Sequence, residues 1–208
     1  MGAETRASQR SALAAYYDWL LDTGRRTERS PLRGMPAVRR PMGVPRPCPD
    51  SVVVEGLAFA DTATQRAIIL ARFAGLRAGE IAAVSAGDVT DDERLRVYGK
   101  GGRVRLVPLH PQVRQMLTEV DGWVFPSAFG GHWAPGTITH RVSRALRGGW
   151  TCHSLRHAFA TEVYRESGCD LRLVQELLGH SSPRTTARYV LVDDDRGRTV
   201  VSGLSLAS

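Results

Sequence analysis

One segment of the chain, residues 23–50, divides the sequence into two parts that must fold separately. It holds six of the eleven prolines and seven arginines, and no apolar period survives in it. Proline fixes φ and removes a backbone donor, and repeated like charges keep a chain extended. The segment is therefore predicted to be an extended, basic linker between residues 1–22 and the dense sequence from residue 51 onward.

The part before the linker contains enough sequence for one helix, at residues 8–22. A single helix cannot bury its own apolar face, so residues 1–22 are predicted to be the last piece of a domain whose remainder is absent. The apolar side chains that recur at helical spacing are Ala12, Ala15, Tyr16, Trp19 and Leu20.

The part after the linker is predicted to be mostly helical. A β-hairpin is expected where LRVY (95–98) and RVRLVPL (103–109) flank the turn GKGG. The fold class is therefore mainly α with a small antiparallel β-sheet (α+β), in a domain of residues 51–190 followed by a tail of residues 191–208. Helices are expected at residues 62–74, 78–84, about 111–120, 136–147, 153–167, 171–178 and 183–190.

Several of these helices carry signals at their ends. Gly75 and Gly179 stand where a glycine commonly ends a helix. Asp170 and Ser182 are expected N-caps, and Pro183 occupies a first helical position.

The charge balance indicates a polyanionic partner, most simply nucleic acid. The net charge is +7 and the pI is about 10.0. Residues 1–50 carry nine basic residues against five acidic ones, and residues 51–208 carry 19 against 16. A coding bias explains a preference for arginine over lysine, but it does not explain the positive excess.

Composition argues against several other classes of protein. No apolar run approaches the roughly 20 residues of a membrane span, and the first ten residues lack the apolar core of a secretory signal. Cys48, Cys152 and Cys169 are odd in number and form no CxxC pair. We therefore expect three free thiols rather than a disulfide framework or a cysteine zinc site.

Lys100, in the turn GKGG, is the only lysine among 28 basic residues. A lysine can release a proton near neutral pH when its environment lowers its pKa, whereas arginine cannot. We infer that position 100 must release a proton, the alternative being a solvated turn lysine.

The stretch HSLRH (153–157) begins a predicted helix and places His153 and Arg156 on one face. Leu155, Phe159 and Val163 lie on another face and are expected in the core. A metal site on His153 and His157 is disfavoured, since no glutamate lies between them and an arginine cation does. Taken alone, the histidines of this stretch are as readily incidental surface residues.

The remaining candidate residues indicate a function only when they are considered together. GLRAGEIAAV (75–84) places Arg77 before a helix and Glu80 three residues later, and a helix N-terminus beside an arginine can hold an anion. Forked guanidiniums bind phosphate oxygens, imidazoles donate or shuttle protons, and a tyrosine hydroxyl is a nucleophile. The full set is Arg77, Lys100, His153, Arg156, His180 and Tyr189.

These residues stand in three motifs that resemble the tyrosine recombinase (phage-integrase) family. GLRAGEIAAV is similar to its first arginine motif, GKGGRVRLVPL to its lysine hairpin, and LRHAFATEVYRESGCDLRLVQELLGHSSPRTTARYV (155–190) to its C-terminal signature. The resemblance covers about residues 51–190, in the family's order and spacing.

The resemblance implies a site-specific recombinase or integrase, of a phage or mobile element, that needs no metal or cofactor. Tyr189 would attack a phosphodiester and form a 3′-phosphotyrosyl link. Arg77 and Arg156 would stabilise the transition state, and Lys100 would protonate the leaving 5′ oxygen. The remaining roles are proton transfer for His153, a phosphate hydrogen bond for His180, and support of the site for Glu80.

The resemblance also implies partners and a domain layout. The partners are double-stranded DNA recombination sites, further copies of the chain in a tetrameric synapse, and an accessory directionality protein, in the cytoplasm of a bacterial host. Residues 1–22 resemble the last helix of the family's core-binding domain and residues 23–50 its interdomain linker. With that domain truncated, we expect DNA binding and site choice to be impaired.

Two further expectations are weaker. The tail either adds a segment to a neighbouring subunit, as tails of this family do, or frays. Four side chains could face DNA, although a solvated basic face is as consistent with the sequence: Arg141, Arg144, Arg147 and His157.

Three alternatives differ in what they do with DNA. A type IB topoisomerase-like enzyme shares the chemistry but does not pair two sites, and a non-catalytic DNA-binding module would not cut. A metal hydrolase is the most distant alternative, and activity that survives EDTA excludes it.

Overall fold

The computed structural model describes residues 2–36, 38, 46–99 and 101–179. The chain forms two compact units, Met1–Val44 and Pro45–Ser208, each described below by itself. Their boundary falls inside the segment that the sequence predicts to be a linker. In the described part, no helix is long and apolar enough to cross a membrane.

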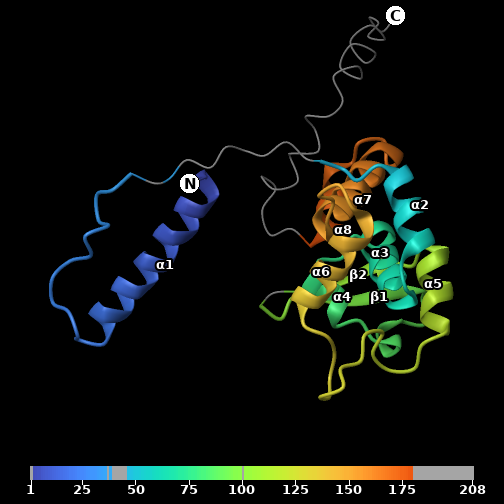
Figure 1. The fold of residues 1–208 in the computed structure, drawn as a ribbon, viewed down its shortest axis with the longest axis horizontal. Helices are drawn as coiled ribbons and strands as arrows, with labels where there is room; N and C mark the ends of the chain where they lie inside the picture. Colours follow the sequence, from blue (N-terminus) through green and yellow to red (C-terminus); the bar gives the residue numbers. More distant parts are fainter. Residues whose placement is uncertain (1, 37, 39–45, 100, 180–208) are drawn as a thin grey trace, which may run out of the picture. The chain divides into compact units, whose positions relative to one another are not determined.

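The first unit contains helix α1 (Ala3–Asp22), which begins five residues earlier than predicted (Figure 1). Tyr16 and Trp19 stack with ring centroids 6.0 Å apart and are 53% and 44% exposed. The Arg25 guanidinium lies over the Trp19 ring at 4.8 Å. The residues of the predicted apolar face lie on α1 and are mostly exposed, and the origin of this helix in a truncated domain remains a prediction.

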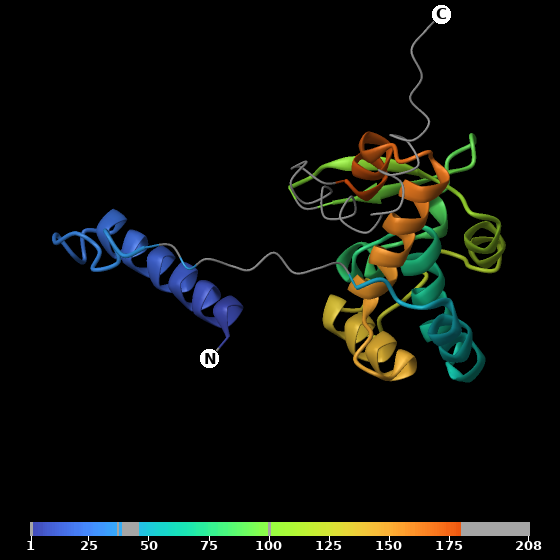
Figure 2. The same cartoon turned by 90° about the horizontal axis from the view of Figure 1, so that it is seen from above.

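The described residues of the second unit are mostly helical, with a two-stranded antiparallel sheet, which confirms the predicted fold class. Figures 1 and 2 show its helices gathered around α3 and α7. In chain order the elements are α2 (Asp50–Phe59), α3 (Thr62–Phe73), α4 (Ala78–Ala82), the 3₁₀ turn η1 (Ala86–Asp88), β1 (Arg94–Tyr98), β2 (Val104–Pro108), α5 (Pro111–Thr118), α6 (Pro135–Leu146), α7 (Cys152–Glu166) and α8 (Leu171–Leu178).

Helix α2 was not predicted from the sequence. Its first residue, Asp50, was placed in the predicted linker. Its run of three valines, residues 52–54, favours a strand by intrinsic preference. The helix forms because Val53 is buried and because Gly56 lets α2 approach α6 closely: a Cβ at Gly56 would lie 2.9 Å from Leu146 Cδ2. Tertiary packing here overrides local preference.

The core lies where α3 packs against α6 and α7. Ile68 and Leu70 on α3, Ile138 on α6 and Leu155 on α7 are fully buried. A second cluster joins α7 to α8 through Phe159, Ala160, Val174 and Leu178. The core therefore fixes α7 and α8 relative to the end of α3, where the candidate site begins.

The predicted signals at both ends of α8 are confirmed. The Asp170 side chain accepts hydrogen bonds from the backbone N–H groups of Arg172 and Leu173. Gly179 ends α8 in the left-handed conformation, at φ 63°. The predicted helix at 183–190, with its cap at Ser182 and Pro183, lies outside the described residues.

The two strands pair in the register Arg94↔Pro108, Val97↔Arg105 and Tyr98↔Val104. Leu95, Val97 and Val107 are buried on the inner face of the ribbon. Because Arg105 pairs with buried Val97, its side chain also starts from the inner face.

Candidate active site

The first part of the site is the start of α4, where Arg77 precedes the helix and Glu80 lies in its first turn. Arg77 is the N-cap of α4, and its backbone N–H donates to Glu80 Oε2 at 2.9 Å. Arg77 Nη1 donates to Glu80 Oε1 at 2.8 Å. The Arg77 side chain is 45% exposed and that of Glu80 only 5%, so the carboxylate is a buried anchor beneath a partly open guanidinium.

Arg156, on α7, reaches the same carboxylate from the core side. Its side chain is only 4% exposed, and Nη1 lies 3.6 Å from Glu80 Oε2. Nη1 also donates to the Gly75 carbonyl, and Nη2 donates to the Leu178 carbonyl at 2.6 Å. Arg156 therefore joins the end of α3, the start of α4 and the end of α8.

Arg105, on β2, supplies the third guanidinium that contacts Glu80, and its role was not predicted from the sequence. Its Nη1 donates to Oε1 at 2.9 Å and its Nη2 to Oε2 at 2.8 Å, a forked pair across 25 residues of sequence. Its Nε donates to the Leu177 carbonyl at 2.8 Å. A signal existed in the strand pattern, because Arg105 shares a face with Val107, and an arginine on an inner face needs a buried acceptor.

The electrostatics of Glu80 follow from these contacts. Burial alone would raise the pKa of this carboxyl, but the hydrogen bonds and charge of Arg105, the Arg77 N–H and the charge of Arg156 lower the pKa to about 2. Glu80 is therefore ionised at neutral pH. Three guanidiniums surround one carboxylate, which leaves an excess of positive charge that suits an oxyanion.

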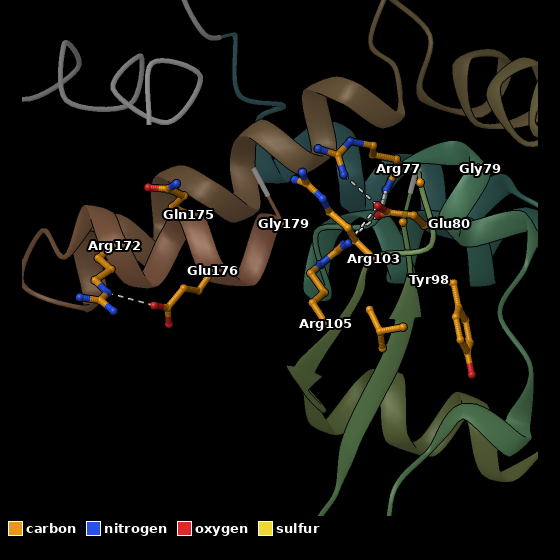
Figure 3. Close-up of a pocket in the computed structure, with 13 residues that line it drawn as sticks. Arg77, Gly79, Glu80, Tyr98, Arg103, Arg105, Arg172, Gln175, Glu176 and Gly179 are labelled. Atoms are coloured by element: carbon orange, nitrogen blue, oxygen red, sulfur yellow. Dashed lines mark hydrogen bonds and ion pairs between the residues drawn. The ribbon is translucent and has the colours of Figure 1, made fainter. Parts of the chain in front are cut away.

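Arg77, Glu80 and Arg105 line a cleft of about 1310 Å³. Figure 3 shows Arg77, Glu80 and Arg105 converging where the hairpin meets α4, with Gly179 at the end of α8 close by. Arg103 also lines the cleft, as do Gly99 and Gly101. The exposed charges of the cleft include an Arg172–Glu176 pair on α8, with Nε and Oε1 3.0 Å apart.

His153 lies at the start of α7 and is exposed, whereas His157 is only 8% exposed. Their ring centroids are 4.2 Å apart, edge to face. His153 and Arg156, predicted to share a helical face, thus differ in burial: the imidazole is exposed and the guanidinium is buried. The burial of His157 leaves it little surface for DNA, so its predicted DNA contact has no support from the geometry.

Three of the predicted site residues, Lys100, His180 and Tyr189, lie outside the described residues. Their chain neighbours are described: Gly99 and Gly101 flank Lys100, and Gly179 directly precedes His180. All three glycines line the cleft that holds Arg77 and Glu80. The structure thus brings together Arg77, Glu80 and Arg156, and the roles of all the predicted residues remain predictions.

The three arginines predicted to face DNA line a second pocket, of about 520 Å³, between α2 and α6. Arg141 Nη1 pairs with Asp61 Oδ2 at 2.8 Å, and its guanidinium lies over Trp133 at 4.8 Å. Arg147 follows the last residue of α6 at φ 50° and lies 3.6 Å from a glutamate, so it leaves the helical face on which it was predicted. Arg144 is exposed and forms no ion pair with any described residue.

The donor types present fit anion chemistry better than metal chemistry. Among the described residues, no three His, Cys, Asp or Glu side chains cluster in a way that could hold a metal ion. The cysteines Cys48 and Cys152 are buried, and desolvation raises the pKa of each thiol to about 11. Cys48, Cys152 and Cys169 form no disulfide within the described part of the chain.

Comparison with known proteins finds a matching family and related enzymes. Residues 52–196 match the model of the phage integrase family. The chain is 32% identical over 215 residues to the tyrosine recombinase XerC of Chromobacterium violaceum, an alignment that covers 93% of this chain and 71% of that protein.

Solved structures give the same result. The integrase from mycobacterium phage Brujita is 30% identical, with a TM-score of 0.61 over 100% of this chain and 76% of that one. The XerH site-specific recombinase, in a post-cleavage complex with a palindromic difH substrate, has a TM-score of 0.72 over 98% of this chain and 68% of that one. At 21% identity, the XerH likeness shows the shared fold.

Proposed function

The chain belongs to the phage integrase family of tyrosine recombinases, and we propose that it cuts and rejoins DNA at specific sites through a 3′-phosphotyrosyl intermediate. The observation that carries the proposal is the convergence of Arg77 and Arg156 on the buried carboxylate of Glu80. Glu80 holds both guanidiniums, that of Arg77 in the lining of the cleft and that of Arg156 buried against the same carboxylate. That arrangement preorganises positive charge where a phosphoryl transition state develops negative charge.

The covalent step is assigned to Tyr189. Its phenolic oxygen attacks the scissile phosphorus and forms a tyrosyl–phosphorus bond, while the bond from phosphorus to the 5′ oxygen breaks. Arg77 and Arg156 bind the non-bridging oxygens, and His180 donates a hydrogen bond to the same phosphate. Because the new phosphodiester conserves the bond energy, the reverse attack by a 5′-hydroxyl rejoins DNA with no nucleotide cofactor.

The proton balance involves two further residues. Lys100 protonates the leaving 5′ oxygen, since a lysine can give up a proton and an arginine cannot. His153, exposed at the start of α7, assists removal of the phenolic proton. A substrate with sulfur in place of the bridging 5′ oxygen has a leaving group that needs no proton, so it should restore cleavage to Lys100→Ala and not to Arg77→Ala.

The proposed partners follow from the reaction. Two duplexes contain four strands to be cut, and each strand needs a tyrosine, so four copies of the chain act in one synapse. Arg144 is the predicted DNA contact that the geometry leaves most available, while Arg141 and Arg147 also pair with protein carboxylates. A phage or mobile-element origin, a bacterial cytoplasm and an accessory directionality protein complete the proposal.

A cleavage assay tests the proposal. Duplexes that the protein binds are selected from a random pool, nicked near candidate cut sites and incubated with the protein in EDTA. We expect SDS-resistant protein–DNA adducts that Tyr189→Phe and Arg77→Ala abolish. Cleavage without the joining of two different sites would favour a topoisomerase-like enzyme. Bound DNA that is never cut would favour a non-catalytic binding module.

A further inference from the structure

We propose that Arg105 is a positioning residue of the active site, which holds Glu80 so that Arg77 remains available to the scissile phosphate. The expected effect on catalysis rests on the proposed function. The positioning of Arg77 by Arg105 is argued from the contacts in the structure alone.

The first step concerns competition for one carboxylate. Arg105 approaches Glu80 with both Nη atoms side by side, at 2.9 Å and 2.8 Å, and so occupies each oxygen with one N–H group. The Arg77 side chain reaches only Oε1 of this carboxylate, through Nη1, while the Arg77 backbone N–H donates to Oε2. Among the described residues, Nε and Nη2 of Arg77 have no hydrogen-bond partner, and the side chain is 45% exposed in the cleft.

The consequence follows from the strength of forked pairs between guanidinium and carboxylate. If Arg105 is lost, a buried carboxylate with unfilled lone pairs remains beside Arg77. Arg77 can then rotate to form the forked pair itself, which turns its outward N–H groups away from the cleft. Arg105 therefore limits the Arg77 side chain to one hydrogen bond with Glu80 and leaves its other N–H groups available to a phosphate.

The second step concerns the segments that Arg105 joins. Its Nε donates to the Leu177 carbonyl at 2.8 Å, one of the carbonyl groups that the end of a helix leaves without an intrahelical partner. The end of α8 is close enough that a Cβ on Gly179 would lie 3.0 Å from Arg105 Cδ. Arg105 thus links the strand that follows Lys100 in the chain to the helix end that precedes His180.

The side chain of Arg105 is suited to this role rather than to DNA contact. It is 11% exposed, and each of its three donor nitrogens is bonded to protein. A lysine at this position would keep the charge, but it could not bridge both carboxylate oxygens and the carbonyl in one plane. This difference allows charge and positioning to be separated by experiment.

The first test needs no cleavage. Inorganic phosphate is titrated into the folded full chain, and its binding is followed by the Nε–H NMR signal of Arg77. We expect Arg105→Lys to raise the phosphate dissociation constant about 10-fold, by analogy with the loss of contacts that support the ligands of metal sites. Arg96→Lys is the matched control, because Arg96 lies exposed on the neighbouring strand, and it should leave the constant unchanged.

The second test uses cleavage. At saturating DNA, Arg105→Lys should lower the single-turnover cleavage rate about 10- to 100-fold per folded molecule. In an Arg77→Ala background, where the Arg77 contact is already absent, adding Arg105→Met should leave the salt dependence of DNA binding unchanged, whereas loss of a direct contact between Arg105 and a phosphate would lower that slope by about one. Wild-type phosphate affinity in Arg105→Lys, or a slope that falls further when Arg105→Met is added to Arg77→Ala, would overturn the proposal.

The two proposals fail in different ways. If the wild-type chain never cleaves DNA but the phosphate result holds, the proposed function is wrong and the role of Arg105 stands. If Arg105→Lys binds phosphate and cleaves as the wild type does, the role of Arg105 is wrong and the recombinase function stands.

Discussion

Replacing Glu80 with glutamine should destabilise the second unit more than any surface carboxylate could. The change keeps the shape of the side chain and removes the charge shared by three guanidiniums. Two of these, on Arg105 and Arg156, have side chains only 11% and 4% exposed. Breaking a buried ion pair on one side leaves uncompensated buried charge and costs about 3–5 kcal/mol.

The structure also predicts how this loss changes with pH. The pKa of Glu80 is lowered from 4.5 to about 2 in the folded chain. The carboxylate therefore stabilises the fold fully above about pH 4.5, and this contribution declines as the pH falls toward about 2. The difference corresponds to about 3 kcal/mol at pH 7, of which about 2 kcal/mol is lost at pH 3.

Urea unfolding of the full chain at pH 7 and pH 3 measures this difference. Trp19 is the only tryptophan before residue 45, so a Trp19→Phe background makes fluorescence report on the second unit alone. The difference in unfolding free energy between the parent protein and Glu80→Gln should be about 2 kcal/mol smaller at pH 3 than at pH 7. Glu176→Gln, at an exposed ion pair, should shift stability by less than about 0.5 kcal/mol at pH 7. A gap that stays constant between the two pH values would refute the reasoning.

Three further predictions concern other parts of the second unit. Gly75→Ala should lower the free energy of unfolding by about 2–5 kcal/mol, because φ is +63° and a Cβ would strike the Phe159 ring. Gly122→Ala, at φ +72° with open space around it, should lower it by only about 1–2 kcal/mol. Equal losses for the two variants in urea unfolding would contradict the packing argument. Arg72→Met should cost about 1–3 kcal/mol, since this 8% exposed side chain bonds two carboxylates, and an unchanged urea midpoint would show that the pairs contribute nothing. Arg144→Ala should weaken DNA binding and lower its salt slope by about one, and an identical slope would remove Arg144 from the interface.

Local signals in the sequence predicted the fold well. The pattern of apolar spacing places the helices of the second unit to within a few residues, and the glycines at 75 and 179 end helices as expected. Helix α2 was not predicted, and the strand preference of its valine run is overridden by the packing of Gly56 against Leu146.

The site was harder to predict because its contacts are non-local. Arg77 and Glu80 are three residues apart, and their pairing follows from helix geometry. Arg105 is 25 residues from Glu80, and only the fold of the hairpin onto α4 brings them together. The deep burial of Arg156 likewise depends on α8, whose Leu178 carbonyl accepts its hydrogen bond. A sequence motif names such residues but does not show which of them support the others.

Mapping the DNA attachment site tests the central claim most directly. The protein is trapped on a nicked duplex, the adduct is digested with protease and nuclease, and the modified peptide is sequenced by mass spectrometry. The recombinase mechanism predicts a nucleotide linked through a 3′-phosphate to Tyr189, and no adduct in Tyr189→Phe. Attachment at another residue, or an adduct that persists in Tyr189→Phe, would contradict it.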